Sequence, residues 1–158
     1  MNQFTLILIP FEKITYETSL NALEIKQRLD ENTISHFGKK NEIIEFKGKV
    51  GLKSFKLTKD ISYMNSFKPV IIGKIIEKEN TAIIRVWQRL SIISFIFLLI
   101  WTIVAIIAFF SIFQEVTSEN WYNFLFVFFG YFITIIGFKT ESIQIRIQLQ
   151  KLLNAKLV

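Results

Sequence analysis

The stretch SIISFIFLLIWTIVAIIAFFSIF, residues 91–113, contains 23 consecutive side chains without an ionisable group. A second uncharged run, residues 121–138, follows after the seven-residue link 114–120. At a helical rise of about 1.5 Å per residue, the runs would extend roughly 35 and 27 Å, close to the about 30 Å hydrocarbon core of a bilayer. The sequence therefore predicts a two-helix transmembrane hairpin over residues 90–138.

The charges that flank these runs predict an orientation. Arg85 and Arg89 precede the first run and Lys139 follows the second, whereas Glu115 and Glu119 are the ionisable residues of the link. The positive-inside rule then puts both termini in the cytoplasm and the link outside. The short apolar N-terminal stretch has no basic residue before it and is not expected to be a secretory signal. We therefore expect a multi-pass protein of the inner membrane.

Composition limits the possible chemistry. The 158 residues include no cysteine and a single histidine, His36, which argues against disulfides, thiolate nucleophiles and imidazole metal cages. The carboxylates follow no metal-ligand or acid–base spacing. We therefore expect no metal, no cofactor and no catalytic residue, and interpret the chain as not an enzyme.

Small residues recur at three- or four-residue spacing on both apolar runs and would let two helix backbones approach closely. They are Thr102, Ala105, Ala108 and Ser111 on the first run, and Gly130, Thr134 and Gly137 on the second. This pattern is typical of packing between the two helices, and a face for self-association is the alternative.

Aromatic side chains with a polar atom lie at the ends and in the middle of the runs. Trp87, Trp121 and Tyr122 occupy positions where such rings anchor at a membrane interface. Trp101 lies mid-run, where its indole N–H needs a partner from another helix, which favours an oligomer.

Residues 1–89 predict a cytoplasmic α+β domain. Alternation around Ile14 indicates a strand, and a leucine stripe after Ser19 indicates a helix of about 12 residues. Segments rich in Ile, Val and Phe then predict strands at 43–50, 54–59, 70–79 and 81–86, with a hairpin turn at Glu79–Asn80. We expect a small antiparallel curved sheet with one helix over a face, for which a pleckstrin-homology-like fold is possible.

The remaining residues, 139–158, form the predicted cytoplasmic amphipathic tail. Residues 141–150 alternate with period two, which indicates a strand, but their position directly after an apolar helix favours a short C-terminal helix lying along the bilayer.

A basic set of residues surrounds the expected sheet and the membrane entry. It consists of Lys47, Lys49, Lys53, Lys56, Lys59, Arg85, Arg89 and Lys139. The set is interpreted either as a solvated sheet face or as a surface that contacts anionic lipid headgroups, where each lysine contributes about 1 kcal/mol. Nucleic acid is the least expected partner.

The segment ISYMNSFKP, residues 61–69, is the most distinctive stretch outside the apolar runs. Asn65 and Ser66 can bond neighbouring backbone, Phe67 can fill a gap against the sheet, and Pro69 can begin a strand. These four residues form either a structural corner or the edge that a partner binds.

Three stretches resemble a family of small, uncharacterised bacterial membrane proteins: 61–76 with its NSF-P corner, IIRVWQRL at 83–90, and GYFITIIGFKTES at 130–142. The resemblance implies a β-rich domain followed by a two-helix transmembrane hairpin in a bacterial cytoplasmic membrane. It implies no activity.

The function expected from these features is a membrane-anchored, non-enzymatic binding or accessory module, such as an adaptor, a regulator or an immunity-type protein. Its expected partners are the lipid bilayer and a protein or a second copy. The alternatives are an oligomeric membrane structural or pore-forming element and, more weakly, a lipid- or peptide-modifying enzyme that uses Asn65 and Ser66.

Overall fold

The computed structural model describes residues 9–34, 46–60, 65–113 and 122–158, with the side chains of 109, 111–113 and 122–127 excepted. The elements in chain order are β1 (Phe11–Thr18), α2 (Ala22–Glu31), β2 (Thr33–Ile34), β3 (Phe46–Val50), β4 (Ser54–Lys59), β5 (Val70–Glu77), β6 (Ala82–Arg89), α3 (Ile92–Phe113), α4 (Tyr122–Leu152) and β7 (Lys156–Leu157).

The strands form one seven-stranded sheet in the order β2-β3-β4-β5-β6-β1-β7. Every neighbouring pair is antiparallel except β2 and β3, which are parallel. The α+β class is confirmed. The sheet is mixed rather than wholly antiparallel, because the two-residue strand β2 adds to β3 in parallel at one edge.

The long strands alternate between a buried and a more exposed face, as their sequences predict. In β5, Ile71 and Ile75 are buried, and between them Gly73 accommodates the Phe55 ring in the space that a Cβ atom would need. The β5–β6 hairpin closes with a hydrogen bond from the Lys78 amide to the Thr81 carbonyl, 2.8 Å long.

Helix α2 begins at a capping box. The Asn21 side chain accepts from the Glu24 amide, and the Glu24 carboxylate accepts from the Asn21 amide, each at 2.9 Å. This reciprocal pair satisfies two otherwise unpaired donors and sets the start at Ala22, three residues after the predicted Ser19. Ile25 and Leu29 on the opposite side are fully buried in the core.

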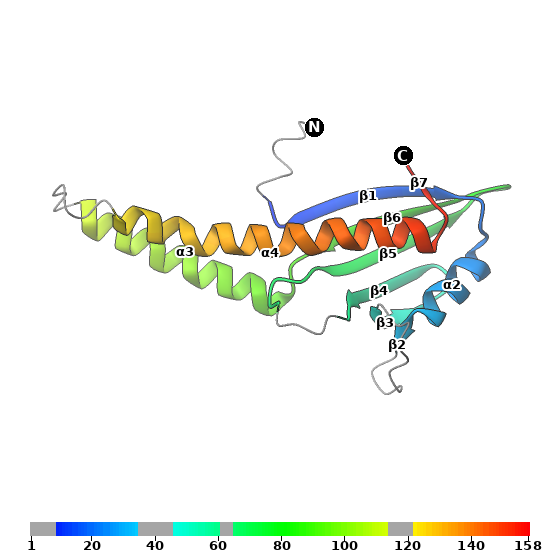
Figure 1. Ribbon diagram of the computed structural model, residues 1–158, viewed down its shortest axis with the longest axis horizontal. Coiled ribbons are helices and arrows are strands. Elements are labelled where there is room, and N and C mark those ends of the chain that lie inside the picture. The colour runs from blue at the N-terminus through cyan, green and yellow to red at the C-terminus, as the bar shows by residue number, and fades with distance from the viewer. Residues whose placement is uncertain (1–8, 35–45, 61–64, 114–121) are drawn as a thin grey trace.

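Helices α3 and α4 lie side by side, and α4 then continues across one face of the sheet (Figure 1). In this second half Ile145 and Leu149 are fully buried in the same core as Tyr16 and Ile84 of the sheet. Residues 141–150 are helical, and the buried positions are four residues apart rather than two. The helix therefore passes without a break through the boundary predicted at residue 138.

The predicted transmembrane hairpin is corrected by the structure. Among the described residues, no helix combines the length and the apolar character that a membrane crossing requires. The predicted inner-membrane location and multi-pass orientation are therefore wrong as well.

Replacing Leu149 tests how much α4 contributes to the core. Leu149→Ala should lower the free energy of unfolding by about 2–5 kcal/mol, because it removes a fully buried side chain and leaves a cavity. Leu23→Ala, on α2 with 66% of its surface exposed, is the matched control and should change stability by less than about 0.5 kcal/mol. Urea unfolding of both variants measures the difference, and equal effects would contradict this core assignment.

Burial raises the pKa of the Tyr16 phenol well above its ordinary value; nearby Arg146 lowers it and Glu12 raises it. The unfolded phenol ionises near pH 10 while the folded one stays neutral, so its contribution is complete below about pH 10 and is lost as pH rises further. Tyr16→Phe should therefore lose less stability than wild type between about pH 9 and 11. Parallel pH dependences in urea unfolding would refute this.

Candidate functional site

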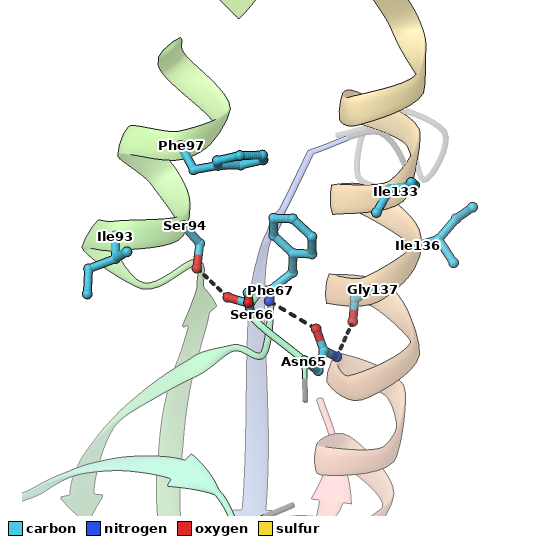
Figure 2. A pocket seen from close by; sticks show the side chains of 9 residues that line it. All are labelled: Asn65, Ser66, Phe67, Ile93, Ser94, Phe97, Ile133, Ile136 and Gly137. Carbon is cyan, nitrogen blue, oxygen red and sulfur yellow. Dashed lines mark hydrogen bonds between the residues drawn. The ribbon is translucent and has the colours of Figure 1, made fainter. Parts of the chain in front are cut away.

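A cavity of about 790 Å³ opens where α3, α4 and the segment before β5 meet (Figure 2). This volume falls in the range of small-molecule and side-chain binding pockets. Its walls are the side chains or backbone of Asn65, Ser66, Phe67, Ile93, Ser94, Phe97, Ile133, Ile136 and Gly137. None of the described lining residues is ionisable, so they offer a largely apolar surface rather than acid–base groups.

The polar floor of the cavity holds the Asn65–Pro69 segment between the two helices. The Asn65 amide nitrogen donates to the Gly137 carbonyl at 3.3 Å, and its oxygen accepts from the Phe67 amide at 2.9 Å. On the other side, the Ser94 hydroxyl donates to the Ser66 carbonyl. Figure 2 shows these bonds on either side of the Phe67 ring, which lies between α3 and α4.

Two ion pairs attach α4 to the sheet next to this floor. Glu141, almost fully buried, lies 3.2 Å from the Lys59 ammonium of β4, and Lys139 lies 2.8 Å from the Glu12 carboxylate of β1. The Lys59 ammonium also donates to the Gln144 side chain. Lys59 and Lys139, which the sequence predicts at a membrane surface, therefore lie between the sheet and α4.

The other face of the sheet has no helix over it among the described residues. Strand alternation and cross-strand register assign eight cations to this face: Lys13, Lys47, Lys49, Lys56, Lys74, Arg85, Arg89 and Lys156. The carboxylate that the strands present on the same face is Glu17, opposite Lys156. We call this surface the open basic face.

The register of the open basic face sets like charges opposite each other. Lys49 pairs with Lys56 across β3 and β4, and Lys74 pairs with Arg85 across β5 and β6. Lys47 lies 2.8 Å from the Asp60 carboxylate, and within the described ranges it is the one cation of this face with a carboxylate within 4 Å. Opposed like charges destabilise a sheet, so this face is costly in the absence of an anion.

Apolar side chains occupy the centre of the same face. Ile72, Trp87 and Lys13 are aligned across β5, β6 and β1, and Ile76 is opposite Ile83 one step along the strands. Trp87, predicted as a membrane anchor, is thus partly exposed among aliphatic side chains on the sheet. The surface combines an apolar centre with a basic surround.

The open basic face includes five residues of the predicted basic set: Lys47, Lys49, Lys56, Arg85 and Arg89. Lys53 is exposed in the β3–β4 turn.

Sequence reasoning missed Lys13, Lys74 and Lys156. Each is a single cation in its own strand, so only the pairing of β1, β5, β6 and β7 brings it to the cluster. One signal in the sequence could have identified Lys74: it is two residues from Ile72 in the same strand, so both side chains lie on the same face of the sheet.

The predicted helix-packing residues have mixed positions. The Trp101 ring packs against Gly130 of the other helix, where a Cβ atom would collide with the indole. Ala105 and Thr134 are buried, Ala108 is partly buried, and Thr102 is exposed.

The other predicted residues lie in or near the cavity or outside the described part of the chain. Gly137 lies against Asn65 and Phe67, and Pro69 is buried at the start of β5. The side chains of Ser111 and Tyr122, as well as His36 and Trp121, lie outside what the structure describes.

No protein-family model, no curated protein and no solved structure matches this chain. The resemblance to bacterial membrane proteins with a transmembrane hairpin is therefore corrected. No family model supports this resemblance, and none of the described helices could span a membrane. Within this chain, the NSF-P corner contacts α4, because the Asn65 side chain donates to the Gly137 carbonyl.

Breaking the buried ion pair tests how α4 is held. Glu141→Gln should lower the free energy of unfolding by about 3–5 kcal/mol, because it leaves the Lys59 charge buried without its counterion. The double variant Glu141→Gln, Lys59→Met should recover most of this loss. Asp30→Asn, in the exposed Lys26–Asp30 pair, is the control and should cost less than about 0.5 kcal/mol in the same assay. A double variant no more stable than the single one would contradict the assignment.

Proposed function

We propose that this protein is a non-enzymatic binding or accessory module whose open basic face binds an acidic surface of another protein. The observation that carries the proposal is the direct opposition of like charges, Lys49 to Lys56 and Lys74 to Arg85. Carboxylates on a partner would convert these repulsive pairs into charge-assisted hydrogen bonds.

The apolar centre supports a protein partner. Protein interfaces combine an apolar, aromatic and arginine-rich centre with a polar rim. Ile72, Ile83 and Trp87 provide the centre, and tryptophan is among the residues that contribute most binding energy at such interfaces. Arg85 and Arg89 can each bind a carboxylate through two parallel hydrogen bonds.

Single-stranded nucleic acid is less well supported. Proteins that bind it stack successive bases on several aromatic rings along a basic groove. The strands of the open basic face present two aromatic residues, Trp87 and Phe11, among several aliphatic ones. The aliphatic centre suits a protein surface better than a row of bases.

A sheet of successive antiparallel strands with the C-terminal helix across one face supports the pleckstrin-homology-like layout that the element order suggested. Such a layout leaves the opposite sheet face free for a partner, as an adaptor or regulator requires.

Reversing one charge next to the apolar centre of the face tests the proposal. Lys74→Glu should weaken binding of a fluorescent peptide of alternating glutamate and leucine about tenfold or more, since a repelled rather than attracted carboxylate costs over about 1.4 kcal/mol. Lys151→Glu makes the same change in net charge at an exposed position on α4 and should alter binding little. Fluorescence anisotropy at low and moderate salt measures both.

The same variant separates binding from folding. Lys74→Glu replaces a repulsive pair with an attractive one opposite Arg85, so stability should stay equal or rise by about 0.2–1 kcal/mol. Tighter binding of a labelled single-stranded oligonucleotide than of the acidic peptide would contradict the choice of a protein partner. Equal peptide binding by Lys74→Glu and wild type would refute the face itself.

A further inference from the structure

An exposed apolar stripe runs along α4, next to the stripe that the helix buries. Its members are spaced alternately by four and three residues and are Phe129, Ile133, Ile136, Thr140, Ile143 and Ile147. All six are exposed, the five apolar ones between 42% and 63%. Positions that recur in this way lie on one side of a helix and are typical of a seam that packs against another helix.

Helix α3 carries a matching stripe. Ile93, Phe97, Ile100, Val104 and Ile107 follow the same spacing of four and three, and all are exposed. Ser94, Leu98 and Ala105, each one residue after a member of the stripe, are buried. The side of α3 that packs against α4 therefore lies directly beside the stripe. Each long helix therefore has a packed seam beside an exposed stripe, and α3 also exposes apolar side chains such as Phe95, Leu99 and Ile106 on its other sides.

The cavity joins the two stripes. Ile93 and Phe97 of the α3 stripe and Ile133 and Ile136 of the α4 stripe line it from the two sides (Figure 2). The stripes therefore flank a common groove instead of facing different directions. We call the two stripes and the cavity the groove face.

We propose that the groove face binds the same face of a second copy of this chain, so that α3 and α4 of two copies form a four-helix assembly. Spacings of four and three residues let side chains of one helix insert into gaps of another, and the cavity is a gap large enough for such side chains. The face is self-complementary in character, as a two-fold interface requires.

The lack of charged residues in the two stripes favours a second copy of this chain over a charged partner. None of the eleven stripe residues is ionisable, so a second copy meets no like-charge repulsion there. The one polar member, Thr140, already donates its hydroxyl to the Ile136 carbonyl at 2.9 Å. Burying it therefore leaves no unpaired donor.

The available area is enough for a stable dimer. If ten apolar side chains each expose roughly 80 Å², about half of what a large apolar side chain covers, they offer roughly 800 Å² per copy. A standard specific interface takes about that area from each partner. Exposed apolar patches of this size on a monomer mark interaction sites.

This self-association does not depend on the proposed partner. The groove face belongs to α3 and α4, whereas the open basic face lies on the side of the sheet that α4 leaves uncovered. A dimer would therefore present two open basic faces, and a bivalent acidic partner would bind it more tightly than it binds one copy.

Sedimentation equilibrium of the full chain tests the proposal with a matched pair of variants. Ile100 lies in the stripe with 56% exposure, whereas Ile106, at 50%, is about 240° further around α3. Wild type should dimerise, and Ile100→Lys should raise the dimer dissociation constant by about 30-fold or more, because a charge is buried without a partner. Ile106→Lys, which lies outside the stripe, should change the dissociation constant by less than about threefold.

The lack of cysteine in the chain allows a second test. Single cysteines introduced at successive positions from 133 to 148 should form intermolecular disulfides most readily within the stripe, with weak cross-linking at flanking Gln144 and Gln148. A flat profile would overturn the proposal. Circular dichroism of each variant confirms that it is folded.

Other occupants of the groove face have distinct outcomes. A wild-type chain that stays monomeric across the concentration range overturns the proposal, as does open-ended aggregation without a dimer. A monomer that floats with phosphatidylcholine vesicles would assign the face to lipid and also overturn it. Equal effects of Ile100→Lys and Ile106→Lys would show that the association does not use the stripe.

Discussion

The packing of the second half of α4 on the sheet is the contact on which the rest of the structure depends. Ile145 and Leu149 join the sheet residue Tyr16 in one core, and α2 adds Ile25 to it. Apolar burial provides most of the stabilisation and is non-directional, so it does not by itself fix where the helix lies. The pairs Lys59–Glu141 and Lys139–Glu12 supply the direction, since each joins a defined point on α4 to a different strand.

This contact gives the two faces of the sheet different roles. The face under α4 and α2 collects the buried side chains, and the opposite face keeps its cations in solvent. The same helix extends beyond the sheet to pack against α3 and presents its exposed stripe outward. One element thus stabilises the core, defines the open basic face by leaving it uncovered, and contributes to the groove face.

Much of the fold was predictable because its signals are local. Strand alternation in residues 54–59 and 70–77 depends only on the two-residue period. The helix start was predicted at Ser19 instead of at the Asn21–Glu24 capping box, although that box also depends on neighbours only three residues apart. The uncharged run at 91–113 predicted a helix within one residue of α3. The interpretation of that run as a membrane span was wrong. An apolar composition shows that the helix must be shielded from water, but it does not show whether lipid or protein shields it.

By itself the sequence determined the α+β class, the long strands and the long apolar helix, because backbone periodicity and capping act over a few residues. Only the tertiary structure decided that Lys59 is buried and Lys139 is half-buried, each in an ion pair with a carboxylate, while another set of cations shares an exposed face: Lys49, Lys56, Lys74 and Arg85. The physical reason is that a charge acquires its surroundings from strands and helices distant in the chain. Register and helix packing, rather than residue type, determine whether it meets a carboxylate, another cation or water.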